Sequence, residues 1–238
     1  MDSLSYRKPQ RSTMTSPSVM RKHGILSKYH DLQLTDYYGF YKSSSDLHKK
    51  FPAHSRDKIK REWEDAKDIA ETILLYFDNI DRALKLGKGI FFFGNSGTGK
   101  SLLMMCIAKE ALNKKYSVRV VSAQGIVDEF AKSWDSEYGQ KDFKTRIMNV
   151  KLLCIEEMNK EFFNSVTIPT LTRVIKYREA NCLATMITCN EDIQIIEKKY
   201  SPTIASAIKG SCKLLRFDSD LDWRDIEQEN WESDLQHK

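Results

Sequence analysis

The chain has 238 residues, 41% of them hydrophobic, which is enough for one large core or for one domain with an appendage. It lacks both the ~18–20-residue apolar run of a membrane span and the apolar core of an N-terminal secretory signal, so we expect neither membrane insertion nor export. The net charge of +5 is unevenly divided: residues 218–238 carry −6, and residues 1–217 therefore carry +11. A basic body suits nucleic acid or an acidic protein partner, although ordinary solubility also explains it.

The cysteines and histidines give no sign of a metal site. The five cysteines are widely spaced, lie mostly inside apolar runs, and are Cys106, Cys154, Cys182, Cys189 and Cys212. No Cys/His cluster has zinc-ligand spacing, and the five histidines lie outside the central segment, which disfavours histidine-based catalysis. Small thiols in a core are typical of a reducing compartment, so we expect a cytoplasmic protein.

The first third of the chain divides into three segments with different predicted structure. Residues 1–22 are rich in Ser, Arg and Lys and predict a flexible arm, and residues 23–57 predict loops with one or two short helices. From about Asp57 to Leu86, apolar residues recur every three or four positions, which predicts a helix. Those positions are Ile59, Trp63, Ala66, Ile69, Ala70, Ile73 and Leu74.

A complete phosphate-binding P-loop follows. An apolar strand over residues 89–93 runs into Gly94-x-x-x-x-Gly99-Lys100-Ser101, and an apolar helix over residues 102–112 comes next, which is the context that the motif requires. We expect Lys100 to neutralise the β- and γ-phosphates and Ser101 to ligate Mg²⁺. The positive end of the following helix also faces the anion. The predicted nucleotide-binding residues are Gly94, Asn95, Ser96, Gly97, Thr98, Gly99, Lys100 and Ser101.

Strands alternate with helices through the rest of the chain. Strands are predicted at 117–121, 152–155, 183–188 and 213–217, and helices at 124–135 and 165–179. This alternation predicts an α/β fold with a parallel sheet covered on both faces. Only 21 residues follow the last strand, too few for a full helical lid.

Polar residues end two of these strands. Glu156 and Glu157 follow the strand 152–155, where we expect Glu156 to hold Mg²⁺, through water, and Glu157 to polarise the attacking water. An exposed pair in a loop is the alternative. Asn190 ends the strand 183–188 and is expected to hydrogen-bond the γ-phosphate or the water, the alternative being a cap for the helix that begins near Glu191. The expected catalytic residues are Glu157, Lys100 and Asn190.

These segments together resemble AAA+ ATPases of the DnaC-type replicative helicase loaders and their IstB-type relatives. The resemblance covers about residues 23–224. It rests on Gly24-Ile25-Leu26-Ser27-Lys28-Tyr29-His30-Asp31, the P-loop, the Glu156-Glu157 strand, Thr185-Met186-Ile187-Thr188-Cys189-Asn190 and Asp222-Trp223-Arg224. It implies a P-loop NTPase fold of AAA+ type, with a parallel five-stranded sheet sandwiched by helices and little or no C-terminal lid. It also implies that the opening segment packs near the adenine.

The chain departs from the family pattern in its acidic and arginine motifs. Glu156 stands where the family usually has Asp, which keeps the charge on a longer side chain. Ala207 stands where loaders usually carry an arginine that is thought to reach a neighbouring subunit's γ-phosphate, and alanine cannot stabilise that charge. Lys209 or Arg178 are the available substitutes, although Lys lacks a bidentate fork.

The resemblance implies a function and an organisation. Residues 1–60 are expected to form a basic arm and partner-binding segment, residues 61–224 the AAA+ ATP-binding domain, and residues 225–238 an acidic tail. The expected protein is an ATPase, slow or partner-stimulated, that uses ATP and Mg²⁺ and binds a replicative DNA helicase and single-stranded DNA, as a homo-oligomer or in a helicase-bound assembly. An IstB-like transposition helper and a non-hydrolysing nucleotide-gated adaptor remain as alternatives. A small-molecule kinase is disfavoured because no arginine-rich lid is apparent.

A polar stretch between the second and third strands is a candidate DNA contact. It contains Tyr138, Lys141, Lys144 and Arg146, and aromatic and basic side chains together can track a single-stranded backbone. A solvated loop explains the same residues equally well.

Overall fold

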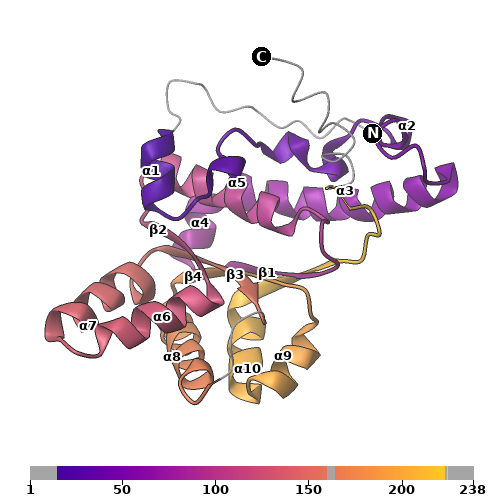
Figure 1. The fold of residues 1–238 in the computed structure, drawn as a ribbon. Helices are drawn as coiled ribbons and strands as arrows, with labels where there is room; N and C mark the ends of the chain where they lie inside the picture. The colour runs from indigo at the N-terminus through magenta and orange to yellow at the C-terminus, as the bar shows by residue number, and fades with distance from the viewer. Residues whose placement is uncertain (1–14, 160–163, 223, 225–238) are drawn as a thin grey trace.

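The protein is described by a computed structural model that covers residues 15–159, 164–222 and 224 (Figure 1). Five strands form one sheet in the order β2-β3-β4-β1-β5, and every neighbouring pair is parallel. The strands are β1 (Gly89–Gly94), β2 (Val118–Ser122), β3 (Leu152–Met158), β4 (Ala184–Cys189) and β5 (Cys212–Phe217). The predicted α/β fold with a parallel five-stranded sheet is confirmed.

Helices cover both faces of the sheet (Figure 1). One layer contains α1 (Pro17–Lys22), α2 (Ser44–His48), α3 (Arg56–Asp78), α4 (Ile80–Lys85) and α5 (Lys100–Asn113), with the 3₁₀ turns η2 (Ser27–Tyr29), η3 (Leu34–Asp36) and η4 (Tyr38–Phe40). The other layer contains α6 (Ala123–Ser133), α7 (Glu137–Phe143), the π-helical turn η5 (Lys144–Met148), α8 (Thr167–Ala180), α9 (Ile193–Lys199) and α10 (Pro202–Ser211).

Because successive strand residues point to opposite faces, each strand serves two cores. In β1, Phe92 packs with the layer of α3 and α5, whereas Phe91 and Phe93 pack with the layer of α8 and α10. The apolar strand runs in the sequence are therefore buried on both sides. Neither core covers the edge of the sheet where the parallel strands end. The candidate site lies at this edge.

The N-terminal segment is more ordered than the sequence suggested. The flexible arm predicted over residues 1–22 is wrong for its last part, because residues 17–22 form α1, while residues 1–14 lie outside the described residues. Met20 is buried in the same core as the sheet, and Thr15 donates to Asn113 Oδ1 through its backbone N–H (2.9 Å) and its hydroxyl (2.8 Å). Long-range packing, which local composition does not report, orders this segment.

The helix predicted from Asp57 to Leu86 is two helices. Ser55 caps α3, its hydroxyl accepting from the Lys58 N–H (3.3 Å), and Asn79 interrupts the helical path with φ −109° and ψ 24°. The Asn79 side-chain amide donates to the Leu75 carbonyl (2.9 Å), which satisfies the end of α3 before α4 begins.

The polar stretch that carries Tyr138 is helical rather than a loop. Ser136 caps α7 by accepting from the Gly139 N–H (3.0 Å), and Phe143 and Ile147 anchor the segment in the core. Across the described part of the chain, all five cysteines are free thiols, and none of the helices has the length and apolarity to cross a membrane. The predicted acidic tail at 225–238 lies outside the described residues.

Candidate nucleotide-binding site

The P-loop connects β1 to α5 and curls at glycines. Gly97 and Gly99 have φ of +74° and +88°, a region that residues with a Cβ rarely adopt. A Cβ would also be crowded here, since one on Gly97 would meet the Asp222 carboxylate and one on Gly99 would lie 2.8 Å from the Tyr37 ring. The loop therefore presents its backbone N–H groups at the start of α5, an arrangement that binds anions.

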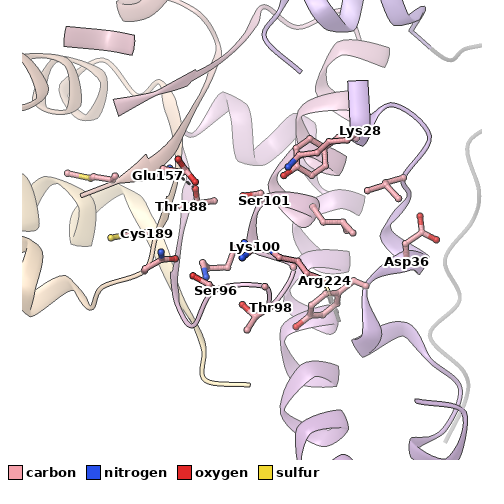
Figure 2. A pocket seen from close by; sticks show the side chains of 18 of the residues that line it. Lys28, Asp36, Ser96, Thr98, Lys100, Ser101, Glu157, Thr188, Cys189 and Arg224 are labelled. Carbon is pink, nitrogen blue, oxygen red and sulfur yellow. Dashed lines mark hydrogen bonds between the residues drawn. The ribbon is translucent and has the colours of Figure 1, made fainter. Parts of the chain in front are cut away.

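A cavity of about 230 Å³ opens beside the loop (Figure 2). Glu157, Thr188 and Cys189 lie on the sheet side, and Lys28 and Asp36 lie on the opposite side. The P-loop lies between these two walls. The cavity is lined by Lys28, Tyr29, Leu32, Asp36, Tyr37, Ser96, Gly97, Thr98, Gly99, Lys100, Ser101, Leu102, Glu157, Met158, Asn159, Thr188, Cys189, Asn190 and Arg224.

Lys100 and Ser101 begin α5 and line the cavity. Lys100 is only 7% exposed, and its ammonium donates to the carbonyls of Gly94 (2.8 Å) and Asn95. It is therefore held inside the curl of the loop, where a bound anion would meet it. Six of the eight predicted nucleotide-binding residues line the cavity; Gly94 and Asn95 do not, but their carbonyls hold the Lys100 ammonium.

The acidic pair lies within a strand rather than after one. β3 continues to Met158, because Glu156 still pairs with Ser122 of β2 and the ladder with β4 resumes at Met158 and Cys189. Between them the register shifts, and Glu157 has a φ of +54°. This bulge turns the exposed Glu157 toward the cavity, and its backbone N–H donates to Thr188 Oγ1 (3.1 Å).

Glu156 is placed differently from its neighbour. It is half-buried and does not line the cavity. Burial, together with the charge of Glu157, raises the pKa of Glu156, and the nearby Lys28 partly opposes this. The two predicted acids thus differ in access, with only Glu157 facing the space where a substrate fits.

Asn190 lines the cavity at the end of β4. The alternative that it caps the following helix is wrong, because Asp192 caps α9 by accepting from the Gln194 N–H (2.9 Å). β4 lies between β1 and β3 in the sheet, and their register sets Cys189 level with Phe93 and Met158. Asn190 and Glu157 are therefore brought to the P-loop by strand geometry.

The wall opposite the sheet was only partly expected. The resemblance pointed to the segment around Tyr29, and the structure adds Leu32, Asp36 and Tyr37. The Lys28 ammonium lies 4.9 Å from the centre of the Tyr29 ring. No local motif marks Asp36 or Tyr37, since contacts with distant segments place them, such as that of the Tyr37 ring with Phe217.

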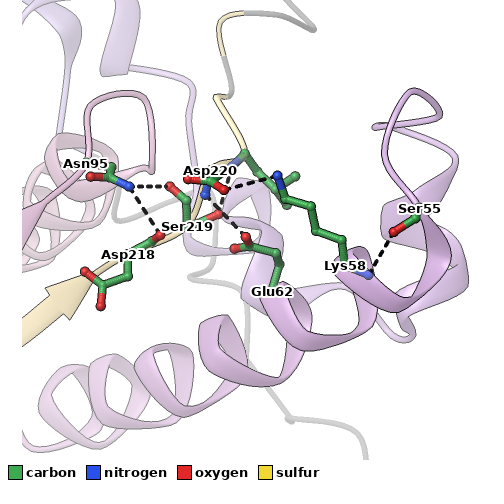
Figure 3. Close-up of polar contacts among 8 residues, drawn as sticks. Ser55, Lys58, Glu62, Asn95, Asp218, Ser219 and Asp220 are labelled. Atoms are coloured by element: carbon green, nitrogen blue, oxygen red, sulfur yellow. Dashed lines mark hydrogen bonds and ion pairs between the residues drawn. The ribbon is translucent and has the colours of Figure 1, made fainter.

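A strap of residues 218–222 lies against Asn95 of the P-loop and against α3 (Figure 3), and Arg224, further along the chain, lines the cavity. The Asn95 side-chain amide donates to the carbonyls of Asp218 and Ser219, both at 3.2 Å. Asp220 then reaches α3, where its carboxylate pairs with Lys58 (3.1 Å) and its N–H donates to Glu62 (3.3 Å). Arg224 is thus an unpredicted cation at the site, and a contact between the P-loop and the strap supports it.

Arg178 is not available as a substitute for the missing arginine. Its side chain is fully buried, and its guanidinium donates to Thr185 Oγ1 (2.9 Å) and to the carbonyls of Ile147, Met148, Val150 and Ala184. Ala207 is also buried, 1% exposed, so this face of α10 packs into the core. Lys209 is exposed and pairs with Glu197 (3.0 Å).

The donor atoms fit magnesium better than a softer metal. No group of three or more His, Cys, Asp or Glu residues among those described could hold a metal ion by itself. The Ser101 hydroxyl and the carboxylates of Glu156 and Glu157 are hard oxygen donors, which suit Mg²⁺, an ion that takes most of its ligands from phosphates and water.

Comparisons with known proteins agree with this geometry. Residues 81–175 match the family model of the bacterial DnaA ATPase domain. A DnaC helicase loader has a similar structure, with a TM-score of 0.63 and 19% identity over 81% of this chain and 100% of that one. DnaI has a TM-score of 0.53 and 21% identity, over 64% of this chain and 84% of that one. Comparison of the sequence with curated proteins finds no match.

AMPPCP-bound DnaA from Aquifex aeolicus is a further structural neighbour, with a TM-score of 0.58 and 18% identity over 72% of this chain. The present chain spans about half of that protein, 53%. These comparisons confirm the resemblance to DnaC-type loaders, and they show that the chain shares the AAA+ fold of these proteins.

Proposed function

We propose that the chain is an ATP-binding and ATP-hydrolysing replication protein of the helicase-loader type, which binds a replicative helicase and single-stranded DNA. One observation carries this proposal: a single cavity collects the P-loop, Glu157 and Asn190, which come from three strand ends. An anion cradle, a carboxylate and an amide side by side are the parts that phosphoryl transfer to water requires.

The P-loop would hold the triphosphate. Lys100 would exchange its carbonyl partners for the β- and γ-phosphate oxygens, a charge-assisted interaction that is stronger than the present contacts. Mg²⁺, when bound, would neutralise charge on the phosphates, held by Ser101, which lines the cavity; Glu156, which lies behind the lining, would act on it only through water. The start of α5 would add its backbone N–H groups.

Glu157 is proposed as the general base. Its exposed carboxylate faces the cavity and can accept the proton of a water that attacks the γ-phosphorus, while Asn190 orients that water or the phosphate. The products would be ADP and phosphate. Arg224, on the same cavity, would add positive charge where charge gathers on the transferred group.

The opposite wall would take the base. Tyr29, Leu32 and Tyr37 give it apolar and aromatic surface, which suits a purine ring.

ATP turnover by wild type and Glu157→Gln tests the enzymatic part. We expect slow hydrolysis by the wild type, stimulated by single-stranded DNA or by a helicase, and a loss of about 100-fold or more in the variant with ATP binding retained. Glu64→Gln, an exposed carboxylate on α3, is the matched control and should hydrolyse ATP at the wild-type rate. Turnover that survives Glu157→Gln contradicts the proposed role.

A non-hydrolysing, nucleotide-gated adaptor is the second candidate, favoured by the buried Ala207 and the buried, bonded Arg178. Both positions lack a free guanidinium to stabilise transition-state charge in a neighbour. ATP binding without turnover under every partner condition would select the adaptor over the enzyme.

The α6–α7 surface is proposed to contact single-stranded DNA. Tyr138 is 81% and Trp134 60% exposed, and the exposed Lys141 and Lys144 lie on the segment that follows. Exposed rings can stack on bases while lysines neutralise phosphates. The double variant Trp134→Ala/Tyr138→Ala should weaken binding of a fluorescent oligonucleotide about ten-fold without changing ATP affinity. Equal affinity in both proteins would place DNA elsewhere.

Affinity capture with ATP tests the protein partner. We expect recovery of a replicative helicase; recovery of a transposase instead would select the IstB-like alternative.

A further inference from the structure

Lys109, in the middle of α5, is a buried lysine whose ammonium binds a turn of the N-terminal segment. The side chain is only 8% exposed. Its ammonium donates to the backbone carbonyls of Tyr29 (2.8 Å), His30 (3.3 Å) and Leu32. Three carbonyls thus converge on the three N–H donors that a lysine carries.

This cluster offsets the cost of burying a charge. Burial lowers the pKa of Lys109, and the carboxylates of Asp31 and Asp36 oppose that shift, as would an ionised Cys106. The Cys106 thiol lies one turn earlier on α5 and donates to the Leu32 carbonyl (3.8 Å), so two residues of α5 hold the same peptide unit. A buried ammonium is tolerated only where its donors are satisfied, as they are here.

The turn that Lys109 binds is part of the cavity wall. Tyr29 and Leu32 both line the cavity, and their backbone carbonyls are two of the three that the ammonium holds. The first turn of α5 carries Lys100 and Ser101 at the opposite, phosphate side of the same cavity. One helix therefore positions both the loop for phosphates and the wall for the base.

We propose that Lys109 is a positioning residue for the nucleotide base: it fixes the 29–32 turn at the distance from the P-loop that a nucleoside triphosphate requires. This inference rests on the proposed function, because it assumes that the cavity takes ATP. It does not follow from the P-loop motif, since the side chain lies outside the cavity and acts through the backbone of another segment.

Loss of the Lys109 contacts should affect the binding of two ligands differently. ATP contacts both the P-loop and the 29–32 wall, whereas inorganic tripolyphosphate contacts only the P-loop. Loosening the wall should therefore weaken ATP binding and leave tripolyphosphate binding unchanged. A lysine that merely stabilised the fold would not distinguish them.

Calorimetric titration of the full chain with each ligand tests this. In Lys109→Met, which keeps the length and removes the donors, we expect the ATP dissociation constant to rise about ten-fold or more, the effect of losing ordered contacts with a base. The tripolyphosphate constant should stay within about two-fold. Lys85→Met is the matched control, since Lys85 is exposed and makes no ion pair with a described residue, and both of its constants should match the wild type.

The outcomes are distinct. Equal weakening of both ligands, or of neither, overturns the role of Lys109 and leaves the proposed function intact. If Lys109→Met does not fold, as judged by its near-ultraviolet circular dichroism, the same titrations of Lys109→Gln decide, because its amide retains two donors and should give an intermediate loss of ATP affinity alone. A wild type that binds ATP no better than tripolyphosphate contradicts the base wall itself, and a wild type that binds neither contradicts the proposed function as well.

Discussion

The two walls of the cavity are built in different ways. The sheet wall consists of residues at or just beyond the carboxyl ends of strands, so Glu157 near the end of β3 and Asn190 after β4 reach the P-loop because three parallel strands finish at one edge. The opposite wall comes from a turn before α3, whose carbonyls at Tyr29 and Leu32 accept from the Lys109 ammonium on α5. The first wall is a property of the fold, and the second depends on a few specific contacts.

This difference indicates where the site can vary. Phosphate chemistry demands one arrangement of backbone N–H groups, cation and carboxylate, so the sheet wall allows few substitutions. The base wall needs only a surface of suitable shape at a suitable distance. Variants that disrupt one wall and leave the other intact can therefore measure what each wall contributes to ligand binding.

The largest expected effect comes from the support of the sheet wall. Arg178 binds the start of β4, through Thr185 and Ala184, and the residues just before β3, through Val150. Arg178→Met would leave several buried carbonyls without a donor, and we expect a loss of about 3–5 kcal/mol in the free energy of unfolding. Urea denaturation measures it. Lys176→Met, on the exposed face of α8, is the control and should change stability by less than about 0.5 kcal/mol.

Lys100→Met should weaken phosphate binding and should therefore lower the affinity for ATP and for tripolyphosphate alike. Because the ammonium would contact phosphates in both, we expect ATP and tripolyphosphate each to bind about 100-fold more weakly, equivalent to about 2.7 kcal/mol. The titrations are those used for Lys109→Met. The two variants should differ, because Lys109→Met should weaken the binding of ATP alone and Lys100→Met the binding of both ligands. If Lys100→Met weakens ATP alone, the phosphates do not lie where the P-loop geometry places them.

The sheet wall is also the part that could be predicted. The P-loop needs a strand before it and a helix after it, and both were visible as apolar runs; alternating strands and helices then required a parallel sheet. Two strand ends with polar residues followed at the same edge. Only the details differed, because a bulge keeps Glu156 and Glu157 within β3.

The rest could not be predicted because it depends on contacts between distant residues. Nothing near Arg178 in the sequence shows that its guanidinium is enclosed by carbonyls about 30 residues earlier. Likewise the sequence shows Lys109 only as one polar position on an apolar helix. Its hydrogen-bond partners lie 77–80 residues away in the chain. Charged residues that are buried by such contacts look, in sequence, like solvated ones.

Asn95→Ala should have a smaller effect, on the strap that brings Arg224 to the cavity. The variant loses two hydrogen bonds to the carbonyls of Asp218 and Ser219 at an exposed position, so we expect a loss of about 0.5–1.5 kcal/mol in stability and a two- to five-fold loss of ATP affinity. Lys58→Met cuts the strap's exposed ion pair with α3 and should cost less, because such pairs contribute little. A larger effect of Lys58→Met would show that α3, rather than the P-loop, holds the strap.

The smallest effect is a dependence of stability on pH that arises from Glu156. Burial and the neighbouring Glu157 raise its pKa above the ordinary value, so the folded state keeps this proton at pH values where the unfolded chain has lost it. The contribution of Glu156 to stability is therefore greatest below the unfolded pKa, and it is lost as the pH rises through the folded pKa. In Glu156→Gln this part of the pH dependence should disappear. The slope of the unfolding free energy against pH should change by less than ~1.4 kcal/mol per pH unit, which is the value for one full proton. Urea denaturation of both proteins between the ordinary glutamate pKa and neutrality measures the difference. Parallel slopes would mean that Glu156 is as hydrated as Glu157, and the contrast between the half-buried acid behind the cavity and the accessible acid that lines it would fail.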